Sequence, residues 1–77
     1  MSQIPLDQVS GPVSVMVDQI QGGWDIRQRL NQMGIHVGDI LTIKQRSRFK
    51  GPVLVEVHGI QMALGRGMAR HISVKSE

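Results

Sequence analysis

The chain has 77 residues, nine of them basic and six acidic, which gives a formal charge of +3. With 40% hydrophobic residues and no cysteine, the composition is that of one small globular domain, and it excludes disulfide bonds and thiolate metal sites. The excess of positive charge is smaller than in nucleic-acid-binding proteins that carry long basic runs, so it decides little about the partner.

The first quarter of the chain predicts one strand. Residues 6–10 are expected to be an irregular lead-in, closed by a turn at Gly11-Pro12. From 13 to 17 valine alternates with other residues, and a period of two indicates a strand that turns one valine face inward. The glycine pair at 22–23 ends this pattern.

A short helix is expected next, over residues 24–33. Its apolar residues recur at intervals of four and three, which places them on one helical face: Ile26, Leu30 and Met33. Gly34 follows at the point where a helix commonly ends in the left-handed conformation that glycine adopts at low cost. Gly38-Asp39 is then a turn pair that leads into the next strand.

Two further strands, 40–46 and 53–57, are predicted to form an antiparallel pair joined by a hairpin loop over 47–52. Residues 62–69 are predicted to form a short helical turn held by tertiary contacts, because each of its glycines costs about 1 kcal/mol in a helix. A final short strand is expected at 72–74.

Together these elements predict a mainly β fold with short helices. Several short strands in 77 residues favour a small antiparallel barrel, closed or half-closed, because closure removes exposed sheet edges. We expect a single domain over residues 1–77, with its core in about 6–74.

The order and spacing of several short strings resemble the FeoA family, the small cytosolic proteins of bacterial ferrous iron transport. The strings are Arg29-Leu30, Met33-Gly34-Ile35, Gly38-Asp39, Gly51-Pro52-Val53, Met62-Ala63-Leu64-Gly65-Arg66 and Met68-Ala69. One departure is His36, where the family commonly has proline. The resemblance implies an SH3-like β-barrel with a helix inserted after the first strand. It also implies a role on the cytoplasmic side of the membrane GTPase transporter FeoB.

Three histidines, His36, His58 and His71, are weak candidates for metal ligands, with Asp39 or Glu56 as a partner carboxylate. They are far apart in the sequence and form no His-x-x-x-His or Glu-x-x-His pair that would preset the geometry of a site. We therefore interpret them as surface or strand-end residues and expect no metal.

A basic hairpin loop is the first candidate for partner binding. It surrounds one of two aromatic residues with alternating cations, and its members are Arg46, Arg48, Phe49 and Lys50. Such a loop either contacts an acidic partner surface or phosphates, or simply keeps a strand edge soluble.

Arg66 and Trp24 complete the candidate set. Arg66 lies between two glycines and is either an arginine finger for the GTPase or part of a tight backbone packing site. Trp24 opens the predicted helix and is either a hydrophobic lid on the core or an interface residue at its rim.

The sequence offers no catalytic arrangement, because it lacks cysteine, a supported Ser-His-Asp set and paired carboxylates. Together with this, the resemblance to the FeoA family implies a cytoplasmic, non-enzymatic accessory without a cofactor that binds and modulates FeoB. Two alternatives stay open. One is a basic barrel that binds nucleic acid, although few aromatics are present to stack on bases. The other is a metal-responsive module using the three histidines.

No apolar run reaches the ~20 residues that span a bilayer, so we expect no direct membrane insertion. The oligomeric state is left open.

Overall fold

The computed structural model describes residues 3–9, 11–46 and 51–76, with the backbone alone at 45 and 46. Six strands form one antiparallel sheet in the spatial order β1-β6-β2-β3-β4-β5. Their bounds are Ile4–Pro5 for β1, Val13–Ile20 for β2, Ile40–Arg46 for β3, Val53–Val57 for β4, Ile60–Leu64 for β5 and Ile72–Ser76 for β6. The helical elements are a 3-10 turn, η1, at Leu6–Gln8, and the helices α1 at Trp24–Gln32 and α2 at Arg66–Ala69. The predicted mainly β fold with short helices is confirmed.

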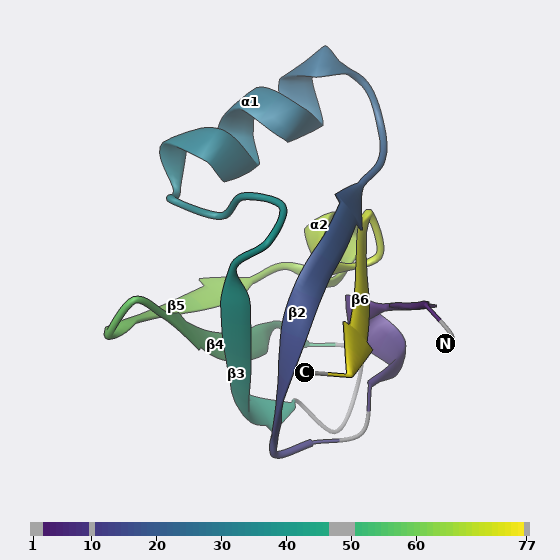
Figure 1. The fold of residues 1–77 in the computed structure, drawn as a ribbon. Coiled ribbons are helices and arrows are strands. Elements are labelled where there is room, and N and C mark those ends of the chain that lie inside the picture. The colour runs from purple at the N-terminus through teal and green to yellow at the C-terminus, as the bar shows by residue number, and fades with distance from the viewer. Residues whose placement is uncertain (1–2, 10, 47–50, 77) are drawn as a thin grey trace.

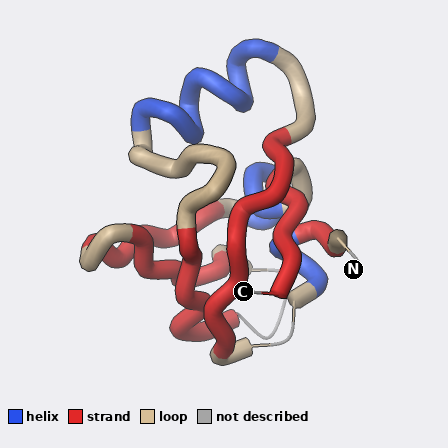
Figure 2. The backbone as a smooth tube through the Cα atoms, in the orientation of Figure 1, coloured by secondary structure: helices blue, strands red, loops and turns tan. Residues whose placement is uncertain are grey.

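The sheet bends strongly around its interior. In Figure 1, β4 and β5 run across the direction of β2, β3 and β6, while α1 lies over one end of the sheet. The tube in Figure 2 shows the same curl without side chains. The pairing register shifts between Val17 and Gln19 in β2 and between Ile43 and Gln45 in β3. Such irregularities bend a strand and raise its local twist, which lets so short a sheet curl.

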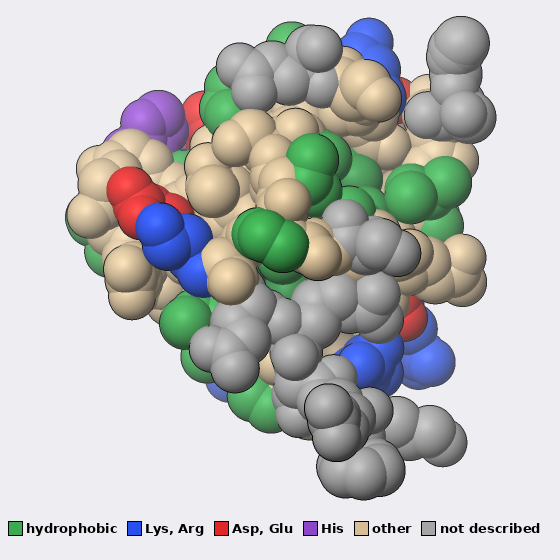
Figure 3. All heavy atoms as spheres, turned by 90° about the horizontal axis from the view of Figure 1, so that it is seen from below, with side chains coloured by type: hydrophobic (Ala, Val, Ile, Leu, Met, Phe, Trp, Pro, Cys, Tyr) green, Lys and Arg blue, Asp and Glu red, His purple; other side chains and the backbone are tan. Residues whose placement is uncertain are grey.

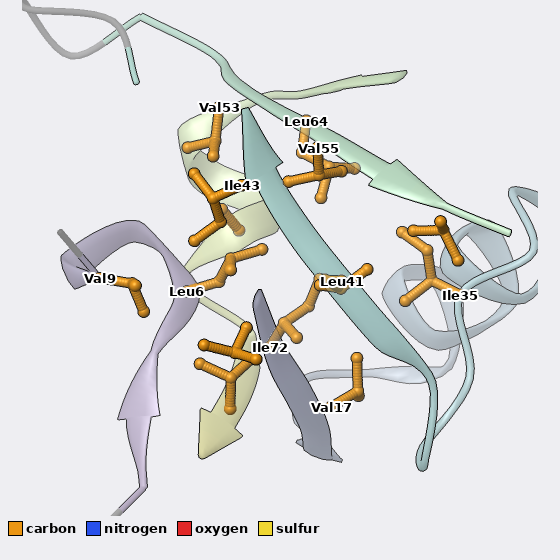
Figure 4. Close-up of a cluster of buried hydrophobic side chains, with 14 of the residues drawn as sticks. Leu6, Val9, Val17, Ile35, Leu41, Ile43, Val53, Val55, Leu64 and Ile72 are labelled. Carbon is orange, nitrogen blue, oxygen red and sulfur yellow. The ribbon is translucent and has the colours of Figure 1, made fainter. Parts of the chain in front are cut away.

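The alternation of the strands decides what fills the interior. In β4 the first, third and fifth residues are buried and the two between them are partly exposed, as the period of two predicts. Apolar side chains from the sheet, η1 and the loop after α1 point into one common interior (Figure 4), including Leu6, Val17, Ile35, Leu41, Val55 and Ile72. No polar or charged residue of the described chain is buried.

The helical turn predicted over residues 62–69 is wrong in its first part, where the chain forms the end of strand β5. His58 and Gly59 have φ values of 53° and 81°, and two successive positive values make the tight hairpin turn that matches the twist of paired strands. The chain therefore returns alongside β4 as strand β5, and the last residue of β5, Leu64, is buried in the core. Only α2, at the end of the predicted range, is helical.

The N-terminal segment is also more than the predicted lead-in. Ile4 and Pro5 pair with β6, and Leu6 in η1 is fully buried. The η1 turn packs against α2 and β6. As a result α1 follows the second strand in chain order, and the first strand is only two residues long.

The end of α1 was predicted correctly and positions the loop that follows. Gly34 has a φ of 90°, the N–H of Gly34 donates to the carbonyl of Asn31, and the N–H of Ile35 donates to the carbonyl of Leu30, each at 3.0 Å. This pair of bonds is a Schellman motif, in which the residue after the glycine packs back on the last turn. Leu30 and Ile35 are accordingly both fully buried. In the described part of the chain, no helix is long and apolar enough to cross a bilayer.

Candidate partner-binding groove

An open groove of about 600 Å³ lies between α1 and the loop at 33–39. We call it the α1 groove and define it by the residues that line it: Ile20, Gly22, Trp24, Arg27, Gln28, Asn31, Ile35, His36 and Val37. The end of β2, the helix α1 and the loop after it follow one another in the chain, and together they form this concave surface.

Trp24 is the most exposed large apolar side chain at this groove. It is 72% exposed, so the interpretation of Trp24 as a lid on the core is wrong. Val37, on the loop, also lines the groove and is 63% exposed. Exposed apolar groups at the edge of a concave surface are typical of a site that a partner covers.

The polar part of the groove comes from one face of α1. Trp24, Arg27, Gln28 and Asn31 are spaced by three, four and seven residues, so they project from the same side of the helix. All four are exposed. The core-facing side of the helix carries Leu30, which is buried, and Ile26, which packs against the core, and these contacts fix the direction in which the polar face points.

Two backbone hydrogen bonds hold the loop of the groove against the sheet. The N–H of Gly38 donates to the carbonyl of Val17, and the N–H of Val17 donates to the carbonyl of Asp39, each at 2.8 Å. Gly38 has a φ of 96°, a conformation that glycine enters at least cost. The loop that presents Val37 is therefore anchored at its C-terminal end to β2.

Asp39 ties the same loop to the β4–β5 hairpin. Its Oδ2 accepts a hydrogen bond of 2.8 Å from the backbone N–H of His36 and lies 3.5 Å from the ring Nδ1 of that residue. Its Oδ1 lies 3.2 Å from Nε2 of His58. Burial raises the pKa of the Asp39 carboxyl, but the hydrogen bond from the His36 N–H, the hydrogen bond and charge of His58 and the charge of His36 together outweigh burial. The pKa of Asp39 therefore lies below its ordinary value.

A lowered pKa in the folded state makes stability depend on pH in a defined direction. Above the ordinary pKa of aspartate, about 4, Asp39 is ionised in both folded and unfolded chains and its stabilisation is complete. As the pH falls further, the unfolded chain takes up the proton first, and the contribution is lost as the pH passes through the folded pKa.

We expect Asp39→Asn to lower the free energy of unfolding by about 1 kcal/mol at pH 7, because the amide loses the charged hydrogen bonds. The difference from the wild type should shrink as the pH falls below about 4. Urea unfolding followed by circular dichroism from pH 7 to pH 3 measures both. If the difference in unfolding free energy between the wild type and Asp39→Asn stays constant from pH 7 to pH 3, the lowered pKa of Asp39 is contradicted.

The structure brings two of the three histidines to one carboxylate and leaves the third elsewhere. His71 precedes β6 and faces Gly22, where an added Cβ would lie 3.1 Å from its Nδ1. Glu56, the other carboxylate considered, lies 3.4 Å from Nζ of Lys44 in an ion pair. Among the described residues, no group of three or more His, Asp or Glu side chains is placed to hold a metal ion.

Arg66 is partly buried and contacts the N-terminal segment. Its Nη1 donates to the backbone carbonyl of Asp7 at 3.3 Å, which joins α2 to η1. This contact gives the Arg66 side chain a structural partner. The interpretation of residues 65–67 as a tight backbone packing site is wrong, because a Cβ added at Gly65 or Gly67 would meet no described atom within 4 Å. As a residue that contacts a partner, Arg66 remains a prediction.

The basic hairpin loop lies largely beyond what the structure describes. Arg48, Phe49 and Lys50 are outside the described residues, and so is the side chain of Arg46. Their role in partner binding also remains a prediction. Figure 3 views the molecule from the side opposite α1, and there the described Lys and Arg side chains lie in separate places rather than in one continuous patch.

Sequence reasoning missed Arg27 and Val37 as groove residues. Arg27 follows Trp24 by three residues, so the helical spacing alone was enough to place it beside the tryptophan. Val37 carried no such signal, because its exposure depends on how the Schellman motif directs the loop.

Comparison with known proteins places the whole described chain in one family. A family model described as the FeoA domain matches residues 4–76. A curated relative from Methanocaldococcus jannaschii, named Fe(2+) transport protein A, is 38% identical over 61 residues, which cover 79% of this chain and 72% of the relative.

Solved structures agree with this fold. The crystal structure of an iron uptake regulatory protein (FeoA) is 28% identical, covers 97% of each chain and has a TM-score of 0.85, which confirms the expected SH3-like fold. A manganese-dependent transcriptional repressor shares the fold alone, at 21% identity and a TM-score of 0.90, over 97% of this chain and 42% of the repressor. With the family model spanning nearly every residue of the sheet and both helices, the chain belongs to the FeoA family.

Proposed function

We propose that this protein is a cytoplasmic, non-enzymatic accessory of ferrous iron uptake that binds a FeoB-type membrane GTPase transporter on its cytoplasmic side and modulates it. Membership of the FeoA family supports this role. The name of the M. jannaschii relative, Fe(2+) transport protein A, points to the same process. In this proposal iron is the cargo of the transporter, and the accessory acts by contact with the transporter.

The observation that carries the proposal is the exposure of Trp24 beside the α1 groove. A tryptophan that is 72% exposed leaves a large apolar surface in water, whereas every other part of α1 that is strongly apolar faces the core. Tryptophan is among the residues most enriched at the energetic centres of protein interfaces. A partner that covers Trp24 and Val37 would remove both from water.

Isothermal titration calorimetry with the soluble cytoplasmic domain of the FeoB-type transporter from the same organism tests the proposal. At 150 mM salt we expect saturable binding with a dissociation constant of about 1–100 μM, the range of a small transient interface. Absence of saturable binding at protein concentrations well above this range would contradict the proposed function.

The same preparation separates the two alternatives. Titration with single-stranded oligonucleotides should give no binding at this salt concentration, and titration with Fe(II) under anaerobic conditions should give no stoichiometric site. Oligonucleotide binding that falls steeply with salt would instead favour a nucleic-acid-binding barrel. Stoichiometric Fe(II) binding that is lost with the three histidines would favour the metal-responsive module.

A further inference from the structure

The α1 groove combines apolar walls with one permanent charge. Among the described residues that line it, Trp24 and Val37 are apolar and strongly exposed, Arg27 is the only Lys or Arg, and none is Asp or Glu. Such a surface is complementary to a ligand that presents an apolar group next to a negative charge.

Arg27 has no ion-pair partner among the described residues, and its side chain is exposed. Two other cations of the described residues are paired, since Lys44 lies 3.4 Å from Glu56 and Lys75 lies 3.4 Å from Asp18. Arg29 and Arg70 are unpaired there like Arg27, but neither lines the α1 groove. Arg27 is therefore available to a carboxylate from outside the chain, and a guanidinium can bind a carboxylate through two parallel hydrogen bonds.

The other ionisable groups near the groove do not take this role. His36 lines it, but its ring lies 3.5 Å from the Asp39 carboxylate, which balances any charge on the imidazole. Asp25 and Arg29 line two other hollows on α1 and not the α1 groove. Asp25 therefore does not contribute a negative charge to the lining of the α1 groove.

We infer that the α1 groove binds a partner segment that presents one large apolar side chain close to one carboxylate. The apolar side chain packs against Trp24 and Val37, and the carboxylate pairs with Arg27. This inference rests on the proposed function and specifies which face of the protein meets the transporter and which chemistry on the transporter is recognised.

A phosphate backbone and a second copy of this chain fit the groove less well. One arginine is few for a polyanion, whose binding normally depends on several phosphate contacts. A second copy carries a formal charge of +3 itself, so long-range electrostatics oppose its approach.

Two arginines of the same helix provide a matched test. Arg27→Glu and Arg29→Glu change the net charge equally, and both residues are exposed, but only Arg27 lines the α1 groove. Calorimetry with the cytoplasmic domain of the transporter at 150 mM salt should show binding at least about tenfold weaker for Arg27→Glu and changed less than about twofold for Arg29→Glu. Circular dichroism checks that both variants are folded.

The carboxylate itself is detected by zero-length cross-linking. Arg27→Lys keeps the positive charge and adds an amine that a carbodiimide joins only to a carboxylate in contact with it. We expect mass spectrometry to find Lys at position 27 linked to an Asp or Glu of the transporter next to a large apolar residue. Arg29→Lys should give no such link.

The outcomes separate the inference from the proposed function. If the wild type binds and both glutamate variants bind equally well, the inference is wrong and the proposed function stands. If the wild type does not bind the transporter domain, both fail. The inference also fails if Arg27→Glu changes the oligomeric state measured by sedimentation, because a second copy then occupies the groove. It fails too if an oligonucleotide displaces the transporter domain from the groove.

Discussion

Leu30→Ala is expected to lower the free energy of unfolding by about 2–5 kcal/mol, the usual cost of removing a fully buried leucine. Leu30 is the only residue of α1 that is buried. An isolated helix of nine residues is not stable in water, so α1 depends on this contact to persist. A chain of this length has roughly 4–12 kcal/mol of stability in total, so the variant should be close to unfolding.

Urea unfolding gives the loss in free energy, and amide hydrogen exchange shows whether α1 opens before the sheet. Ile26→Ala is the matched control, because Ile26 lies on the same helical face and is only partly buried. It should cost about 1 kcal/mol. Similar losses for the two variants would contradict the claim that Leu30 is the main contact between the core and the helix that carries the α1 groove.

Leu6→Ala is expected to lower the free energy of unfolding by a similar amount, about 2–5 kcal/mol. Leu6 is fully buried in η1, which packs against α2 and β6, and the contact of Arg66 with Asp7 joins the same elements. The alanine leaves a cavity where three elements meet and where the surrounding backbone is fixed by strand pairing.

Ile4→Ala is the control for this second variant, since Ile4 belongs to the adjacent β1 and is 39% exposed. It should cost less than about 1 kcal/mol. Thermal unfolding should place Leu6→Ala about 10 °C or more below the wild type and Ile4→Ala within a few degrees of it. If Leu6→Ala unfolds at the same temperature as the wild type, residues 6–10 are the irregular lead-in that the sequence predicts.

The parts of the fold that follow from the sequence are those with a strong local pattern. The bounds of β3 and β4 match their predicted ranges, 40–46 and 53–57, because alternating apolar residues are bounded by glycine and proline. The end of α1 was equally clear, because Gly34 occupies a position that needs a positive φ.

The elements that were missed lack such a pattern. In β5 only Leu64 is buried, so the alternation is weak, and its spacing from Met68 imitates a helix. A 3-10 turn such as η1 buries one side chain and has no period to detect. The contact between Asp39 and His58 depends on a hairpin that returns through β5, so the error in β5 concealed it.

Of the residues that line the α1 groove, only Trp24 was predicted from the sequence to contact a partner. Trp24 was singled out by residue type, but its exposure follows from the direction in which Leu30 anchors the helix. Arg27 was not predicted, because one arginine on an amphipathic helix is usually a solvated charge. The structure places it in the α1 groove, and the partner-binding role follows only from that position.

The central claim is that a FeoB-type transporter contacts this protein at the α1 groove. The chain contains one tryptophan, so the 15N-labelled protein has a single indole N–H resonance, which belongs to Trp24. On addition of the unlabelled cytoplasmic domain, we predict that this resonance and the amides of 27–28 and 35–37 shift or broaden. The amide of Ile60, equally apolar and 62% exposed on the β4–β5 hairpin, should stay unchanged. Shifts confined to Ile60 or to the 47–50 loop, with the Trp24 indole unaffected, would contradict the claim.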